Sequence, residues 1–371
     1  MKVPFVDLIS QYKNIKLEID KSIKRVIEDS AFIGGKYVKE FENEFKNIYG
    51  VKHCVPLANG TDAIYLALRA LNIGLGDEVI TTAFSWISTS ETISQTGAKP
   101  VFVDIDSIYY TIDTKLIESK INKNTKAIIP VHLYGQMADI EEIKKICDRH
   151  NLYMIEDCAQ SHFSEYKDLR AGLWGDIGTF SFYPGKNLGA YGDAGCVITS
   201  NELFSNKIRM LANHGALIKH EHKLEGVNSR LDGIQAAILN VKLKYILEWT
   251  VKRKKIANYY MKRLNKIGDV ILPKIRKNSS HSFHLFVIKT NFREKLKEFL
   301  SKNQISTAIH YPTALPFLQA YDYLKYKREE FPQSYNHQQT ILSLPMYPEL
   351  SKDKQDFVIS KIIYFYENLV S

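Results

Sequence analysis

The segment FSFYPGKNLGAYGDAGCVI, residues 180–198, places one lysine, Lys186, in a glycine-rich turn between two apolar runs. A second apolar run, LYMIEDCAQ at 152–160, lies upstream and carries an acidic residue, Asp157, near its end. Near-continuous apolar runs are typical of strands that are covered on both faces, as in a mostly parallel sheet. The two runs therefore predict two buried strands, one ending at a carboxylate and the other leading into a lysine turn.

The same pattern extends through the first two-thirds of the chain. Helical patterns, such as those at 62–71 and 140–150, lie between apolar runs that are rich in β-formers. This alternation predicts an α/β fold with helices on both sides of a mostly parallel, seven-stranded sheet. The predicted strands are 53–57, 78–82, 99–104, 125–132, 153–156, 178–183 and 195–199.

The pattern changes near Leu231, where the sequence to Gly268 predicts a long helix with little interruption. We expect this helix to link a large domain, residues 1–245 with an N-terminal helix, to a small α+β domain, residues 246–371. The small domain is predicted to contain short strands in HSFHLFVIKT (281–290), a helix at 292–301 and a final helix at 352–369.

Composition restricts the class of protein. The 371 residues suffice for two domains, and the formal net charge of +9 comes from lysines and arginines spread along the chain. This spread argues against a nucleic-acid partner and favours an anionic substrate. We expect a cytoplasmic protein, because there is no signal-peptide or membrane-length apolar run and the four cysteines have no disulfide-like spacing. Neither the cysteines nor the histidine pairs suggest a metal site.

The strand-end Asp157 and the turn Lys186 together predict a pyridoxal 5'-phosphate (PLP) site. A lysine amine forms a Schiff base with the cofactor aldehyde, and a carboxylate keeps the pyridine nitrogen protonated. Partial burial lowers the pKa of a lysine, because desolvation disfavours its charged form. The alternative, a solvated turn lysine, is less consistent with the surrounding glycines and the upstream Asp157.

Other residues supply the remaining parts of such a site. Gly60 and Thr61, in LANGTDAIY at 57–65, lie at a strand-to-helix turn whose free backbone N–H groups attract anions. Ser181 could also donate to a phosphate, Trp86 could stack on the ring, and Gln160 could bond the ring hydroxyl. Each residue alone has an ordinary explanation: a helix cap, a core tryptophan or a surface amide. The set as a whole favours the cofactor.

The chain resembles the DegT-type sugar-nucleotide aminotransferases, which are PLP enzymes of the aspartate-aminotransferase fold. The resemblance covers essentially the whole length and implies the fold of PLP-dependent transferases of type I. It rests on ordered motifs: VPFVDLISQY (3–12), the run from Gly34 to Leu68, VHLYGQMADI (131–140), IEDCAQSHFSEY (155–166), FSFYPGKNLGAYGDAG (180–195), NSRLDGIQAAIL (228–239) and IHYPTALP (309–316).

The resemblance implies roles for single residues. Lys186 and Asp157 would be catalytic, as the Schiff-base lysine and the partner of the pyridine nitrogen. Asn228 would reach the phosphate of the neighbouring subunit, so a homodimer with shared active sites is expected. The other cofactor-binding residues would be Gly60, Thr61, Trp86, Gln160 and Ser181, and the substrate candidates are Tyr183, Lys219, Arg230, His310 and Tyr311. Arg230 could equally form a structural ion pair, and Lys219 could be a loop charge.

The segment SFYPGKNLGAYGDAG (181–195) resembles the corresponding segment of relatives that aminate C3 of a keto-sugar. The expected reaction moves an amino group from L-glutamate to a dTDP-linked 3-keto-6-deoxyhexose. The product would be a dTDP-3-amino-3,6-dideoxyhexose for a surface polysaccharide such as an O-antigen or S-layer glycan. Lys186 argues against the dehydratase branch, which carries histidine there.

Three alternatives stay open at this point. One is a C4 aminotransferase acting on a UDP- or dTDP-linked 4-keto-6-deoxyhexose. Another is a non-catalytic regulator that binds PLP. A nicotinamide-dependent sugar oxidoreductase is the third, although NIGLGDEV (72–79) lacks the third glycine and the strand–turn–helix setting of a dinucleotide fingerprint.

Overall fold

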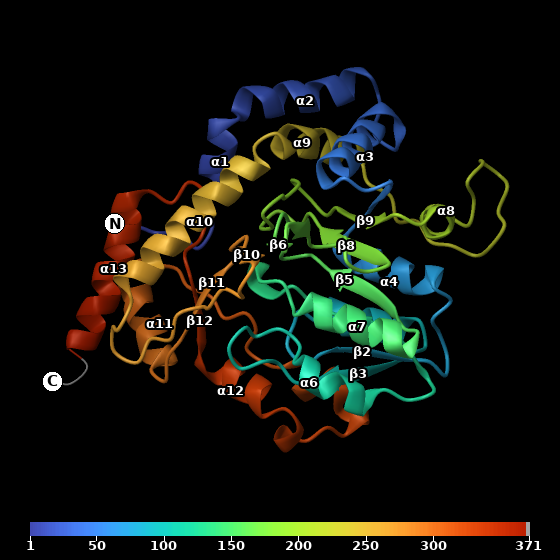
Figure 1. Cartoon of the computed structure of the whole chain (residues 1–371). Coiled ribbons are helices and arrows are strands. Elements are labelled where there is room, and N and C mark those ends of the chain that lie inside the picture. Colours follow the sequence, from blue (N-terminus) through green and yellow to red (C-terminus); the bar gives the residue numbers. More distant parts are fainter. Residues whose placement is uncertain (369–371) are drawn as a thin grey trace.

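One seven-stranded sheet forms the centre of the protein in the computed structural model, which describes residues 1–368 (Figure 1). The strand order is β1-β9-β8-β5-β4-β2-β3, and β9 alone runs antiparallel to its neighbours. The predicted α/β fold with a mostly parallel sheet is confirmed. The strands are β1 (His53–Leu57), β2 (Glu78–Thr82), β3 (Lys99–Val103), β4 (Thr125–Ile129), β5 (Tyr153–Asp157), β8 (Ile177–Ser181) and β9 (Gly195–Thr199).

Helices cover both faces of this sheet, and alternate residues of each strand point to opposite layers. In β2, Ile80 packs in a layer with α2 (Lys16–Glu28), α3 (Gly35–Tyr49), α7 (Ile140–His150) and α9 (Gly233–Leu243). Its neighbour Val79 packs in the opposite layer with α4 (Gly60–Ala70), α5 (Ser88–Gln95) and α8 (Glu202–Ala212). Burial on both faces explains why these strands are almost wholly apolar.

The predicted single helix after Leu231 is wrong in one respect, because it is two helices. α9 ends at Leu243, and α10 (Ile246–Arg263) begins after a turn at Lys244 and Tyr245. In the turn, hydrogen bonds between residues three apart replace the α-helical ones between residues four apart. The Tyr245 N–H, for example, donates to the Lys242 carbonyl at 3.0 Å. No glycine or proline marks the break, so the sequence carries no local signal for it.

The chain after α10 builds its own apolar cluster around a two-stranded antiparallel sheet. The first residues of the protein join this part, because Val3 forms a β-bridge with Ile305, and Figure 1 places the N-terminus beside α13. The elements are β11 (Phe286–Lys289), β12 (Ile341–Leu344), α11 (Arg293–Lys302), α12 (Pro332–Thr340) and α13 (Lys352–Glu367). The predicted end of the last helix at Leu369 lies outside the described residues.

Smaller elements complete the structure. A three-stranded sheet joins the two parts of the chain, because β10 (Ser279–Ser280) pairs with β6 (Glu165–Tyr166), which pairs with β7 (Leu169–Arg170). The remaining helices are α1 (Leu8–Asn14) and α6 (Thr114–Ile117). Within residues 1–368, none of the helices combines the length and the apolar character that crossing a membrane requires.

Candidate active site

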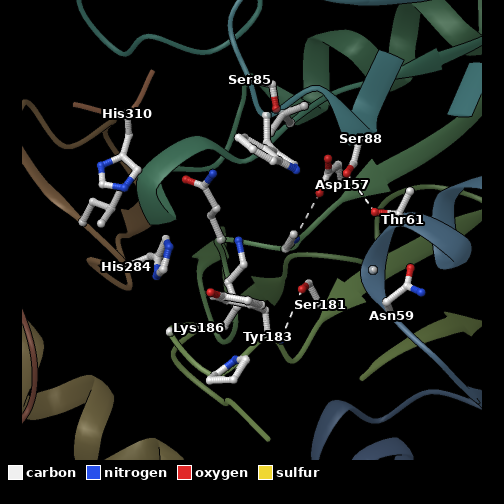
Figure 2. Close-up of a pocket in the computed structure, with 18 of the residues that line it drawn as sticks. Asn59, Thr61, Ser85, Ser88, Asp157, Ser181, Tyr183, Lys186, His284 and His310 are labelled. Carbon is white, nitrogen blue, oxygen red and sulfur yellow. Dashed lines mark hydrogen bonds between the residues drawn. The ribbon is translucent and has the colours of Figure 1, made fainter. Parts of the chain in front are cut away.

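A cavity of about 670 Å³ lies where the ends of several sheet strands meet the C-terminal part of the chain. Figure 2 shows Asn59 and Thr61 on one side of it, His284 and His310 on the other, and Lys186 and Tyr183 between them. Most of the residues predicted from sequence line this cavity: Gly60, Thr61, Trp86, Asp157, Gln160, Ser181, Tyr183, Lys186, His310 and Tyr311.

Lys186 lies in a tight turn that follows β8. Its backbone N–H donates to the Tyr183 carbonyl at 2.8 Å. Gly189 is required in the same turn, because a Cβ there would come within 2.3 Å of the Pro184 carbonyl oxygen. Burial lowers the pKa of Lys186 to about 8, against the opposing attraction of the Asp157 carboxylate. About a tenth of its amine is therefore neutral and nucleophilic at pH 7, far more than for a lysine with the ordinary pKa.

The Lys186 turn is held by residues that sequence reasoning missed. Asn187 contacts the C-terminal part, with its Nδ2 donating to the Ser282 carbonyl at 3.2 Å. On the other side, Nζ of Lys242 in α9 donates to the Gly189 carbonyl at 2.7 Å. Lys242 lies between apolar residues of a helix, and such a lysine is a weak sequence signal for a buried role.

Asp157 ends β5 as a buried carboxylate with both oxygens hydrogen-bonded. Oδ2 accepts from the Thr89 hydroxyl at 2.8 Å, and Oδ1 accepts from the Ala159 N–H at 3.1 Å. These two donors fix the carboxylate at the cavity wall and offset the cost of burying it. Thr89, on α5, was also not predicted, because its contact with Asp157 joins two distant parts of the chain.

The Gln160 carboxamide is oriented by two partners. Its Oε1 accepts from the backbone N–H of Tyr134, and its Nε2 donates to the Tyr311 hydroxyl, both at 2.8 Å. Burial raises the pKa of Tyr311, so this phenol stays protonated at neutral pH. Because Tyr311 accepts from Gln160, its own O–H is available to the cavity.

The start of α4 forms an anion-binding cradle. The Asn59 side chain caps the helix by accepting from the Asp62 N–H at 2.7 Å, yet within residues 1–368 no acceptor meets the N–H groups of Gly60 and Thr61. The Thr61 hydroxyl lies 2.8 Å from the hydroxyl of Ser88 (Figure 2). Free N–H groups at a helix N-terminus, together with hydroxyl donors, suit a phosphate.

Aromatic and imidazole rings form the remaining walls. Trp86 is 57% exposed at the rim, with its ring 5.7 Å from that of Tyr311. Burial lowers the pKa of His310 to about 4 and that of His284 well below its ordinary value, so both rings are neutral. Neutral imidazoles can donate or accept hydrogen bonds without adding charge beside Lys186.

Three predicted residues lie outside the cavity of this chain. Asn228, Lys219 and Arg230 belong to the segment between α8 and α9, which Figure 1 shows extending away from the body. Lys219 and Asn228 are exposed, and Nη1 of Arg230 donates to Oδ1 of Asn213 at 3.3 Å. None of the three is among the residues that line the cavity of this chain.

A buried cluster behind Asp157 has its hydrogen bonds satisfied by the protein. His132, Glu156 and Cys158 come together there, with Nε2 of His132 bonded to Glu156 at 2.8 Å. Nδ1 of His132 accepts from the Ala138 N–H, and the Glu156 carboxylate accepts from the N–H groups of residues 172, 174 and 175. The cluster is thus a structural support for the end of β5.

These residues fit PLP. The cradle of Gly60, Thr61 and Ser181 offers unpaired donors for a phosphate, while the buried Asp157 carboxylate and the Lys186 amine face the same cavity. A carboxylate suits a protonated pyridine nitrogen, and a partly neutral amine suits an aldehyde.

The model of the DegT/DnrJ/EryC1/StrS aminotransferase family matches residues 13–363. The chain is 43% identical to a protein named pleiotropic regulatory protein from Geobacillus stearothermophilus, over 99% of this chain and 100% of that one. It is 41% identical to the dTDP-3-amino-3,6-dideoxy-alpha-D-galactopyranose transaminase of Aneurinibacillus thermoaerophilus, over 97% and 98%. A UDP-N-acetyl-3-dehydro-alpha-D-glucosamine 3-aminotransferase from Acidithiobacillus ferrooxidans is 40% identical, over 95% of both chains.

Solved structures agree with these relationships. The crystal structure of DesV from S. venezuelae, in complex with a ketimine intermediate, superposes with a TM-score of 0.97 and 36% identity over 99% of both chains. A Bacillus subtilis protein solved with bound PMP superposes with a TM-score of 0.90 and 29% identity, over 99% of this chain and 86% of that one.

Proposed function

Because the chain belongs to the DegT/DnrJ/EryC1/StrS aminotransferase family, we propose that it aminates C3 of a dTDP-linked 3-keto-6-deoxyhexose with L-glutamate as donor. It is a PLP-dependent sugar-nucleotide aminotransferase. The product is a dTDP-3-amino-3,6-dideoxyhexose, a precursor of a surface polysaccharide such as an O-antigen or S-layer glycan. One observation carries the chemistry: Lys186, with its lowered pKa, and Asp157 line the same cavity.

PLP, when bound, supplies an aldehyde that takes up the amino group and a ring that withdraws electrons from the donor α-carbon. Lys186 would hold this aldehyde through its amine. Its Nζ would accept the proton from the α-carbon of glutamate in the first half-reaction and donate a proton to C3 of the sugar in the second, while a water molecule would release the 2-oxoglutarate. Asp157, held by Thr89, keeps a proton on the ring nitrogen.

Other side chains bind and orient. Gly60, Thr61 and Ser181 bind the phosphate, Trp86 covers one face of the ring, and Gln160 donates to the ring hydroxyl. Tyr183, His310 and Tyr311 also line the cavity and would contact the sugar. Nζ of Lys186 is the better proton acceptor in this cavity, because burial lowers the pKa of His310 to about 4 and that of His284 well below its ordinary value, whereas the pKa of Lys186 is about 8.

The proposal includes a homodimer. Asn228 is exposed in the segment between α8 and α9, and in a homodimer it would reach the phosphate cradle of the other subunit. Lys219 and Arg230 lie on the same segment and offer positive charge to the nucleotide diphosphate. The support for this step is that neither residue lines the cavity of its own chain and that neither forms an ion pair within residues 1–368.

The name of the Aneurinibacillus relative favours a dTDP-linked 6-deoxy sugar, whereas that of the Acidithiobacillus relative favours a UDP-linked 3-keto sugar. The purified protein should therefore be given glutamate with dTDP-3-keto-6-deoxyhexose, dTDP-4-keto-6-deoxyhexose and UDP-linked 3-keto sugar in parallel. We expect turnover with the first, and NMR should locate the new nitrogen on C3.

Variants at two lysines provide the control. Lys186→Ala should abolish turnover, whereas Lys126→Ala, at an exposed position of β4, should keep it. Nitrogen on C4 would replace the proposal with the C4 alternative, and preference for the UDP sugar would change the nucleotide. No amino transfer to any of these sugars would favour a regulator, as the name of the Geobacillus relative suggests for that protein.

A further inference from the structure

Tyr134 has a backbone conformation that is unusual for a large side chain. Its φ of 60° and ψ of 0° lie in the left-handed region, which sterically disfavours residues with a Cβ. The turn continues through Gly135, with a φ of 104°, where a Cβ would come 2.8 Å from the backbone nitrogen of Phe283. Residues held in a disfavoured backbone conformation cluster at functional sites, so this conformation beside a cavity points to a functional role for Tyr134.

All polar groups of Tyr134 are engaged. Its N–H donates to Oε1 of Gln160 at 2.8 Å, and its carbonyl accepts from the Leu285 N–H at 3.2 Å. Its hydroxyl donates to the carbonyl of His310 and lies 3.2 Å from Nε2 of His337. Because a phenol carries one hydrogen, Nε2 of His337 is the protonated nitrogen in this arrangement.

These bonds connect separate walls of the cavity. Gln160 comes from the end of β5, whereas Leu285, His310 and Tyr311 come from the C-terminal part, and all four line the cavity. The hydrogen bond from Nε2 of Gln160 to the Tyr311 hydroxyl closes a loop of hydrogen bonds. The loop returns to Tyr134 through the neighbouring His310, whose carbonyl accepts from the Tyr134 hydroxyl. A displacement of either cavity wall would break at least one hydrogen bond of this loop.

This closed loop of hydrogen bonds also determines the orientation of the Gln160 carboxamide. A backbone N–H can be met only by the amide oxygen, so the Tyr134 N–H directs Oε1 away from the cavity contacts and Nε2 toward Tyr311. One of the two N–H groups on Nε2 remains for a further acceptor. With Gln160 as donor, Tyr311 keeps its own O–H for a ligand.

We propose that Tyr134 is a positioning residue. It fixes the relative positions of the Gln160 and Tyr311 side chains by forming hydrogen bonds to both walls of the cavity. Its N–H sets the direction of the Gln160 carboxamide, and its hydroxyl sets the place of the His310–Tyr311 segment. The inference rests on the proposed function in one respect: the partners of Gln160 and Tyr311 are taken to be the cofactor ring hydroxyl and the sugar.

Tyr134→Phe tests the hydroxyl, because it keeps the ring and the backbone N–H and removes the bond to His310 together with the contact to Nε2 of His337. In the cofactor-free protein we expect the amides of residues 309–311 to exchange hydrogen about tenfold faster, while those of α9 keep their rates. In the holoenzyme we expect kcat/KM for the sugar nucleotide to fall about tenfold, with the cofactor Kd within about threefold of wild type.

A double-mutant cycle separates positioning from general damage. If Tyr134 acts through Tyr311, the Tyr134→Phe/Tyr311→Phe protein should lose no more activity than the worse single variant. Tyr110→Phe is the matched control: its ring centroid lies 4.1 Å from that of His337, and its hydroxyl has no hydrogen bond within residues 1–368. This control should leave exchange and activity unchanged.

Two results would overturn the inference: exchange rates in Tyr134→Phe equal to those of wild type, or activity losses that multiply in the double variant. The exchange measurement needs no substrate. A failure of every keto-sugar to react would therefore refute the proposed function, while the exchange rates would still decide the role of Tyr134.

Discussion

Nζ of Lys242 donates to the carbonyl of Gly189 at 2.7 Å, three residues beyond Lys186. The same nitrogen lies 4.2 Å from the centroid of the Tyr191 ring, and the Lys242 side chain is completely buried. Burial lowers the pKa of Lys242 to about 7, from an ordinary value of 10.5. The turn that carries Lys186 is therefore held by an amine that loses its charge near neutral pH.

This pKa predicts a pH-dependent stability. Between pH 7 and 10.5 the unfolded chain binds a proton at Lys242 that the folded chain has lost, so the free energy of unfolding rises with pH. The slope for one proton is about 1.4 kcal/mol per pH unit. Wild type should gain about 2 kcal/mol relative to Lys242→Met between pH 7 and 8.5, measured by urea unfolding of the cofactor-free proteins.

Below pH 7 both states bind this proton, so the difference between wild type and Lys242→Met should become constant. Lys244→Met, two residues further along the chain, is the control, because this lysine is exposed and should leave the pH slope unchanged. Parallel curves for wild type and Lys242→Met above pH 7 would mean that the amine stays charged in the fold.

The Asp157 carboxylate opposes the lowering of the Lys186 pKa, and this opposition can be tested in the cofactor-free protein. Asp157→Asn removes the negative charge, so the pKa of Lys186 should fall below 8, by about one unit. At pH 7 the amine should therefore be acylated faster in the variant than in wild type. Mass spectrometry of the Lys186 peptide across pH 6–9 measures the midpoint.

Lys126 is exposed and supplies an internal rate standard in the same samples. Because Asp157→Asn is also expected to abolish transamination, a more reactive Lys186 in an inactive protein would separate loss of the carboxylate from loss of the fold. An unchanged or raised midpoint would contradict the electrostatic coupling of the two residues.

Thr89 should control cofactor affinity through Asp157. Thr89→Val removes the hydroxyl that donates to Oδ2 at 2.8 Å, and a hydrogen bond to a buried carboxylate contributes about 1.5–3 kcal/mol. We expect the Kd for PLP to rise at least about tenfold, measured by fluorescence titration of the cofactor-free protein. Thr89→Ser, which keeps the hydroxyl, should recover most of this affinity.

Thr92→Val provides a comparison on the same helix. Its hydroxyl is also buried but donates to the backbone carbonyl of Ser88 rather than to Asp157. Equal losses of affinity in Thr89→Val and Thr92→Val would point to damage of α5 instead of loss of the Asp157 contact.

Local patterns were sufficient to predict the strands and the principal pair of the site. β5 and β8 are largely apolar because both faces are covered; Asp157 is the last residue of β5, and Lys186 follows β8 closely in sequence. The order of the strands could not be predicted, since it depends on pairing between distant segments. The turn at Tyr245 was missed because its residues have near-helical backbone angles and no breaker.

The supporting residues escaped sequence reasoning for a related reason. Each of them contacts a site element that is distant in sequence. Thr89 is 68 residues from Asp157, and Tyr134 is 26 residues from Gln160. Lys242 is 53 residues from Gly189 in the Lys186 turn. A threonine, a tyrosine and a lysine are common in helices and loops, so none carries a signal until the fold brings its partner close. The family resemblance implied roles for the cavity residues, which stay predictions, but it did not imply these contacts.

The close approach of α4 to β8 gives a final prediction. A Cβ at Gly60 would lie 2.6 Å from Cβ of Ser181, so Gly60→Ala must push the start of α4 away from the strand. We expect a loss of about 1–3 kcal/mol in stability and at least a tenfold rise in the Kd for PLP, because the phosphate donors of both elements separate. Gly74→Ala, whose Cβ would meet only the Thr96 carbonyl at 3.4 Å, is the matched control and should change neither quantity appreciably. Wild-type affinity in Gly60→Ala would show that the phosphate is bound elsewhere, since the cradle cannot accept a Cβ and keep its shape.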